Sequence, residues 1–194
     1  MFKKAGKQRR YECLLNVRNF HYENFNRWTS YFCLATGALF IGYYNLIDKN
    51  KSTEEIMVLV LGYIISLFWY WSAKGYYYWY INFIKLINDC ETKLNPKKRV
   101  YFVFADKKAE NNYCSPISGA NISTSKVAIL FPFIVALFWG FLLFSKFFNL
   151  NDCKCVCCKC LAFFSVVMIT LLLSYLIPKS FLKSNIDDYP ELKD

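Results

Sequence analysis

The sequence has 194 residues, enough for one domain, and 56% of them are hydrophobic. Aromatic residues make up 20%, including 19 Phe and 15 Tyr, and the mean hydropathy is +0.20. A soluble domain of this size has too little interior to bury so many aromatic side chains, and disordered chains are poor in them, so both classes are excluded. In so hydrophobic a chain, the net charge of +10 indicates the cytoplasmic face of a membrane before it indicates nucleic acid.

Four stretches contain no Asp, Glu, Lys, Arg or His, and they cover residues 29–46, 56–73, 127–144 and 161–177. At ~1.5 Å of rise per residue, each reaches roughly 26–27 Å, close to the ~30 Å thickness of the bilayer hydrocarbon. Four such stretches leave almost no polar sequence to cover a soluble core. We therefore predict an all-α integral membrane protein with four transmembrane helices. The first stretch lies too far from the start, and lacks the small-residue site, to be a cleavable signal peptide.

The basic residues predict the orientation. Of the 24 Lys and Arg, 19 lie in residues 1–28, 74–126 and 178–194, and 5 lie in the short loops 47–55 and 145–160. The positive-inside rule then puts both termini and the central segment in the cytoplasm, and both loops outside. The predicted division begins with a cytoplasmic helix (1–28), two spans (29–73) and a cytoplasmic helix-and-loop module (74–126). Two further spans with a Cys-rich outer loop (127–177) and a cytoplasmic tail (178–194) follow.

Residues 9–27 predict a helix that runs into the first span. Leu14, Val17, His21 and Trp28 fall on one of its faces at three- and four-residue spacing. Its basic residues are suited to anionic lipid headgroups, although a plainly solvated helix fits them as well.

After the second span the helix is predicted to continue over residues 76–94, because this stretch contains no Pro or Gly until Asn95-Pro96 ends it. Its polar side chains form one narrow stripe of Asn82, Lys85, Asp89 and Thr92. The apolar remainder is too wide for a free surface helix. We therefore expect a cytoplasmic helical bundle, in which this helix packs on the N-terminal helix or on a neighbouring subunit.

The segment before the third span is the least helical in composition. Residues 99–104 are strand-like, and Ser123 or Thr124 is the expected cap of the next helix. Basic residues flank the strand and are our candidates for binding a cytoplasmic partner protein or its RNA: Lys97, Lys98, Arg99, Lys107 and Lys108.

Signals for catalysis are poor. His21 is the single histidine, and only two residues separate it from Arg18, too few for the spaced Arg/His motif of nucleolytic helical domains. No Gly-rich phosphate loop or nucleophile elbow is present. We expect a protein that is not an enzyme, with no metal, cofactor or small-molecule substrate. The spans also lack the ionisable groups of secondary transporters, but an oligomer could still line a pore with neutral side chains.

Small residues recur at four-residue spacing in two spans and are candidates for close helix packing, within the subunit or between subunits. They are Ala38 and Gly42 in the first span, and Ala128, Pro132, Ala136 and Gly140 in the third.

Five cysteines lie within eight residues of the second short loop: Cys153, Cys155, Cys157, Cys158 and Cys160. On the predicted outer side these thiols favour disulfides, and the odd number leaves one for a bond between subunits. Soft-metal binding and no specific role are alternatives, and with an inverted topology acylation would be expected.

Three further segments carry a family resemblance: Arg18, Asn24 and Phe25 before the first span, the aromatic exit over residues 67–70, and the approach 121–126 to the third span. With them, the layout over residues 10–145 resembles the RipA-like octameric membrane proteins of bacteria and the small membrane accessories of type VI-B CRISPR systems. The Cys-rich loop is a departure from that pattern.

The resemblance implies an oligomeric protein of the bacterial inner membrane. Its expected function is that of an antiphage defence effector, or pore, that alters membrane integrity. The alternative is a membrane-anchored regulator of a cytoplasmic RNA-guided nuclease, without a pore. A third, weaker hypothesis is a thiol or metal protein of the outer leaflet.

Overall fold

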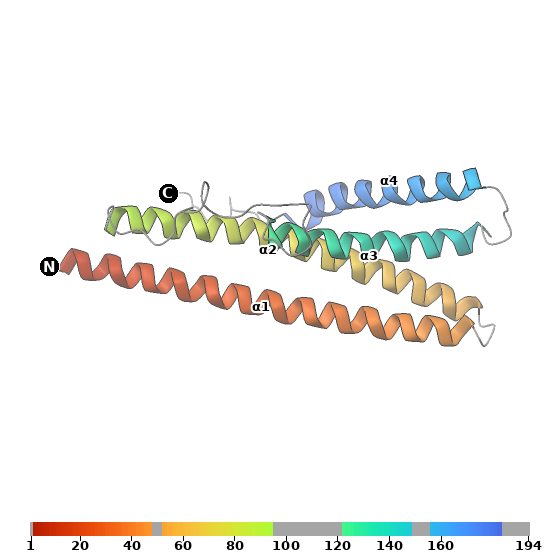
Figure 1. Cartoon of the computed structure of the whole chain (residues 1–194), viewed down its shortest axis with the longest axis horizontal. Coiled ribbons are helices and arrows are strands. Elements are labelled where there is room, and N and C mark those ends of the chain that lie inside the picture. Colours follow the sequence, from red (N-terminus) through yellow and green to blue (C-terminus); the bar gives the residue numbers. More distant parts are fainter. Residues whose placement is uncertain (1, 48–51, 95–121, 149–155, 184–194) are drawn as a thin grey trace, which may run out of the picture. The chain divides into compact units, whose positions relative to one another are not determined.

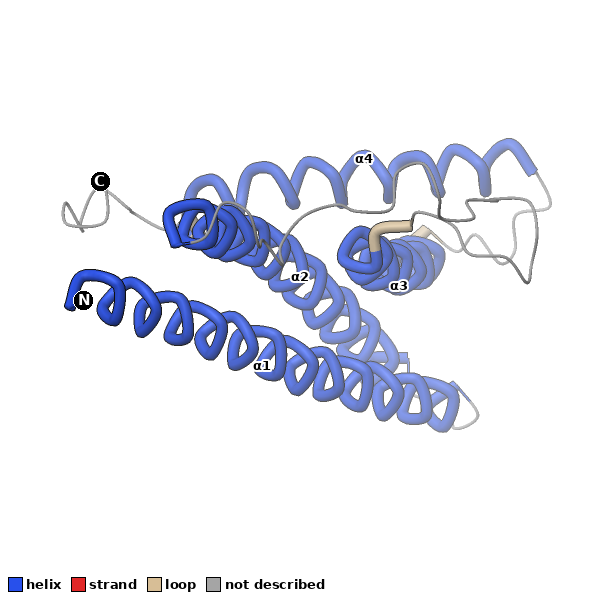
Figure 2. Tube along the Cα trace, turned by 60° about the vertical axis from the view of Figure 1, so that its left-hand side comes forward, coloured by secondary structure: helices blue, strands red, loops and turns tan. Residues whose placement is uncertain are grey.

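The computed structural model describes residues 2–47, 52–94, 122–148 and 156–183, and within them the chain forms four helices and no strand (Figures 1 and 2). The helices are α1 (Phe2–Ile47), α2 (Ser52–Leu94), α3 (Thr124–Phe147) and α4 (Val156–Phe181). All four are long and apolar enough to cross a membrane. The prediction of an all-α chain with four membrane helices is therefore confirmed.

Each predicted span lies inside one helix, and the helices extend beyond the spans. α1 has 46 residues and α2 has 43, and α2 ends one residue before Asn95-Pro96. At the start of α3, Ser123 is the cap, because its carbonyl oxygen accepts from the backbone N–H groups of Lys126 and Val127 at 3.0 and 3.1 Å. The predicted strand at 99–104 lies outside the described residues.

The chain divides into two compact units. Unit 1 comprises Met1–Tyr31 and Ser72–Ile129, and unit 2 comprises Phe32–Trp71 and Leu130–Asp194. The described part of unit 1 holds the first part of α1, the last part of α2 and the first residues of α3. Unit 2 holds the remainder of these helices and α4.

In unit 1, α1 and α2 pack as an antiparallel pair. Tyr11 of α1 contacts Glu91 of α2, whereas Phe25, further along α1, contacts Tyr76, earlier in α2. Ile87 is fully buried, and the predicted polar stripe from Asn82 to Thr92 is exposed as expected. Of the two partners expected for the apolar face of α2, the N-terminal helix is the one the structure places there.

The buried face of α1 agrees with the predicted one at Leu14 and His21, which are half-buried, but not at Val17 and Trp28. Val17 and Trp28 are 42% and 54% exposed. The more buried positions instead follow the heptad spacing of Tyr11, Arg18 and Phe25. A repeat of seven residues, or 3.5 residues per turn, keeps one seam of a helix facing its partner. Val17 and Trp28 do not lie on this seam of α1.

In unit 2, helices α2, α3 and α4 pack around Leu67, Trp71 and Ala136. Trp139 of α3 is fully buried, and Phe40 of α1 lies over it with a ring separation of 4.5 Å. The core of this unit therefore combines aromatic side chains of α1, α2 and α3 with aliphatic side chains of α2 and α4.

Candidate functional site

An aromatic stack joins the two helices of unit 1. Phe25 stacks on Tyr76 with ring centroids 3.9 Å apart, and His21 stacks on the same ring at 4.8 Å. Phe83 meets His21 edge-on at 5.4 Å. Burial lowers the pKa of His21, so the imidazole is neutral at pH 7. This arrangement is that of a packing histidine on a helix face.

A hydrogen bond between Tyr11 and Glu91 also joins α1 to α2, nearer to the N-terminus of α1 than the aromatic stack. The Tyr11 hydroxyl donates to the Glu91 carboxylate at 2.6 Å, and Glu91 is only 6% exposed. The hydrogen bond, together with burial, raises the pKa of Tyr11 to about 12. The positive charge of Arg18 opposes this increase. Tyr11 is therefore a permanent donor at neutral pH.

Polar side chains link α2 to α4 inside unit 2. The Tyr63 and Thr170 hydroxyls lie 2.8 Å apart, and the Trp71 indole N–H donates to Ser174 Oγ at 3.3 Å. Hydrogen bonds of this kind between membrane helices average ~0.6 kcal/mol. These two hydrogen bonds lie about two turns apart along α2 and together define the register of α2 against α4.

An ion pair closes one end of unit 2. Lys146 Nζ in the last turn of α3 lies 2.5 Å from Glu55 Oε2 in the first turn of α2. The Glu55 side chain is 5% exposed and that of Lys146 is 31% exposed. Both residues were predicted only as loop charges that define the topology. The two residues are 91 positions apart, so no local sequence pattern predicts their pairing.

The small residues of the third span lie in different surroundings. Pro132, Ala136 and Gly140 are buried in unit 2, and a Cβ on Gly140 would lie 2.9 Å from a Val166 methyl group. Ala128, in unit 1, is half-buried. A tighter contact than any of these was missed: a Cβ on Gly62 would lie 2.5 Å from the Trp139 ring.

The small residues of the first span face open space. Ala38 is exposed, and a Cβ on Gly42 would meet no atom within 4 Å. In the most apolar 18-residue stretch of α1, 6% of residues are buried within the chain, against 39% in α2. Leu34 and Ile41, on the same side of α1, are 72% and 68% exposed. This surface of α1, with Leu34, Ala38, Ile41 and Gly42, is here called the open α1 face.

Three of the five clustered cysteines are helical. α4 begins at Val156, so Cys157, Cys158 and Cys160 lie exposed in its first turns rather than in the expected loop. Cys153 and Cys155 lie outside the described residues. Within the described ranges, no group of three or more His, Cys, Asp or Glu is placed to hold a metal ion.

The candidate partner-binding residues also lie outside the part of the chain that the structure describes. They are Lys97, Lys98, Arg99, Lys107 and Lys108.

Four membrane-length helices with a largely apolar exterior define a multi-pass α-helical membrane protein. Residues 8–148 match the model of the octameric membrane protein family (8xMP), which is well over half of the chain, and the chain belongs to that family. Comparison with curated proteins and with solved structures finds no match. The family membership establishes an oligomeric membrane protein.

Proposed function

We propose that the protein is a homo-oligomeric effector of antiphage defence in the bacterial inner membrane, and that its assembled form alters membrane integrity. The open α1 face carries this proposal. It is apolar, its small residues leave room for a second backbone, and the described residues of its own chain do not cover it. Small residues on membrane helices allow backbones to approach closely. The defence setting is supported by the resemblance to CRISPR accessories, and not by any catalytic group.

The composition of the spans favours a pore that is gated by wetting of an apolar constriction and that has no charged selectivity filter. The predicted spans contain no Asp, Glu, Lys, Arg or His, so an opening between subunits would have apolar and neutral polar walls. Such constrictions are closed while dry and conduct once water enters. In this proposal the termini and unit 1 lie in the cytoplasm, where the basic segments bind anionic headgroups and the protein has no enzymatic activity.

Membrane potential tests the proposal directly. The chain is expressed in bacteria together with the CRISPR system that triggers it, and a potential-sensitive dye is followed after induction. We expect depolarisation with the wild-type chain and none with Gly42→Trp, which places a large side chain on the open α1 face. Gly42→Ala, which adds a single methyl group at the same open position, is the matched control. An unchanged potential with the wild-type chain under triggering would refute the effector function.

The charge distribution favours a second candidate, a membrane-anchored regulator of a cytoplasmic nuclease. Residues 1–28 and 74–126 each carry a net charge of +5, and Lys7, Arg9 and Arg10 are exposed on α1. Such a surface attracts RNA or an acidic protein. Reversing the five basic residues from Lys97 to Lys108 should abolish co-purification of the nuclease and leave membrane insertion intact. Co-purification that survives the change would eliminate this candidate.

A further inference from the structure

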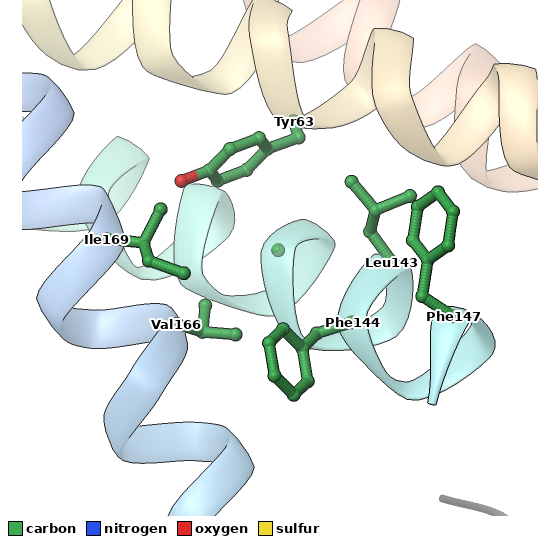
Figure 3. Close-up of a pocket in the computed structure, with 7 residues that line it drawn as sticks. Tyr63, Leu143, Phe144, Phe147, Val166 and Ile169 are labelled. Atoms are coloured by element: carbon green, nitrogen blue, oxygen red, sulfur yellow. The ribbon is translucent and has the colours of Figure 1, made fainter. Parts of the chain in front are cut away.

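A cavity of about 140 Å³ lies inside unit 2 where α2, α3 and α4 meet (Figure 3). It is partly open at its rim. Its walls are the apolar side chains of Leu143, Phe144, Val166 and Ile169, together with the Tyr63 ring. The volume is close to the ~150 Å³ of engineered apolar cavities that stay dry and bind benzene. The cavity therefore suits a hydrocarbon and excludes water.

The lining residues contain no unsatisfied side-chain polar group that would favour a polar ligand. The hydroxyl of Tyr63 is the one side-chain polar group among the lining residues, and Thr170 already satisfies it at 2.8 Å. Among the described residues, the charge nearest to the lining along the chain is Lys146, beside Phe147 at the rim, and it is paired with Glu55. These two charges neutralise each other. This pair therefore offers no net charge to a lipid headgroup.

The rim is continuous with the lipid-facing surface of the helices. Phe147 and Ile169 both line the cavity and are 62% and 44% exposed. Neighbouring positions on α4, such as Phe164 and Leu172, are 65% and 59% exposed. At this level of a membrane-crossing bundle, the molecules next to such a surface are phospholipid acyl chains.

We infer that the cavity is a binding site for one phospholipid acyl chain, which enters from the bilayer between α3 and α4. In a bilayer, transfer from water does not drive this binding. Attraction comes from dispersion contacts, which atoms around an empty void lack and a seated chain restores. Gly140 itself lines the cavity beside Val166 and Tyr63, so the seated chain contacts the α3 backbone there as well as the surrounding side chains. The inference is independent of the proposed function, because either an effector or a regulator would hold the lipid in the same way.

Photolabelling of the full chain tests the site. The protein is reconstituted in vesicles of phosphatidylethanolamine and phosphatidylglycerol, doped with phosphatidylcholine carrying a diazirine near the end of one acyl chain, and adducts are mapped by mass spectrometry. We expect adducts at Leu143, Phe147 and Ile169 at least threefold above those at the lipid-facing residues Ile134 and Leu172. Equal labelling along the exposed surfaces of α3 and α4 would overturn the site.

Two variants sharpen the test. Ile169→Trp fills the cavity and should abolish the enrichment, whereas Met168→Trp, at a neighbouring position that is 67% exposed, should retain it. Leu143→Trp fills the cavity from α3 and replaces Ile169→Trp if that variant is not monodisperse. Enrichment that persists in the filled variants would overturn the proposal. Absence of cavity adducts in the wild type would also overturn it, and would indicate that a neighbouring subunit occupies the space.

Discussion

Of the glycines that the structure describes, Gly62 has the least room for a side chain. A Cβ there would lie 2.5 Å from the fully buried ring of Trp139, whereas a Cβ on Gly37 would meet nothing within 4 Å. Gly62→Ala should lower the stability of the detergent-solubilised protein by about 1–3 kcal/mol, because the ring must shift in a packed core. Gly37→Ala should be neutral or stabilising, since Ala favours the helix. Thermal melting of the two variants checks this, and equal melting temperatures would contradict the contact.

His21 makes unit 1 sensitive to acid. Burial holds the folded pKa of its imidazole below the ordinary value of 6.5, so the unfolded chain takes up the proton first as the pH falls. The contribution of neutral His21 to stability is therefore present above pH 6.5 and is lost as the pH falls below it. Tyr76 and Phe83 face the ring from α2, and Arg18 is the nearest cation along α1.

The chain has a single histidine, so the effect can be assigned to one residue. We expect the melting temperature of the wild type to fall between pH 7.5 and 5.5. In His21→Phe, which keeps an aromatic ring on Tyr76 but cannot titrate, this fall should be smaller. An identical pH dependence in both proteins would show that His21 does not couple to folding.

At the scale of helices, the Glu55–Lys146 pair connects α2 to α3. Lys146→Met leaves the nearly buried carboxylate of Glu55 without this counter-ion and should cost about 3–5 kcal/mol. Lys93→Met is the matched control. It breaks the exposed i,i+4 pair of Lys93 with Asp89, whose side chains are 63% and 56% exposed, and should cost about 0.3–0.5 kcal/mol.

The double variant Glu55→Leu/Lys146→Met should recover most of the stability, because two apolar side chains leave no uncompensated charge. Chemical or thermal unfolding in detergent measures all four proteins. If the double variant is as unstable as Lys146→Met, the pair contributes through packing and not through charge.

The helices themselves could be predicted from sequence because their causes are local. Charge-free stretches of bilayer length and the Asn95-Pro96 break are each visible within a few residues, and so is the exposed stripe from Asn82 to Thr92. The packed face of α1 was not predictable in the same way. Apolar and aromatic residues occur around its whole circumference, so Val17 and Trp28 fit a helical period as well as Tyr11 does, and only the partner helix decides.

The contacts that hold the units together join residues distant in sequence. Tyr11 and Glu91 are 80 positions apart, and Tyr63 and Thr170 are 107 apart. The surroundings of a glycine are equally hard to predict from the sequence of its own helix. Gly62 and Gly42 look alike in sequence, yet one is in contact with Trp139 and the other faces open space. A property that depends on the neighbour across a helix interface is not encoded in the spacing of one helix.

At the scale of the whole molecule, the open α1 face should decide assembly. Gly42→Trp should shift the oligomer of the wild type toward smaller species, because the indole prevents close approach of another backbone. It should leave the monomer folded, since the position has free space in the chain. Native mass spectrometry measures this, with Gly42→Ala as the control that adds only one methyl group at the same position. An oligomer that is unaffected by Gly42→Trp would exclude this face from the subunit contact.

The exposed thiols have a practical consequence: the native chain carries its own reporters of membrane sidedness. Cys13 lies exposed on α1 before the predicted first span, and Cys157 and Cys160 lie exposed in the first turns of α4. The predicted orientation places these two groups on opposite faces of the bilayer. After reduction of outer-face disulfides with a reductant that cannot cross membranes, a maleimide that is equally impermeant should therefore modify Cys157 and Cys160 in intact spheroplasts, and Cys13 only after lysis. The reverse order would invert the topology, and no engineered cysteine is needed to learn which holds.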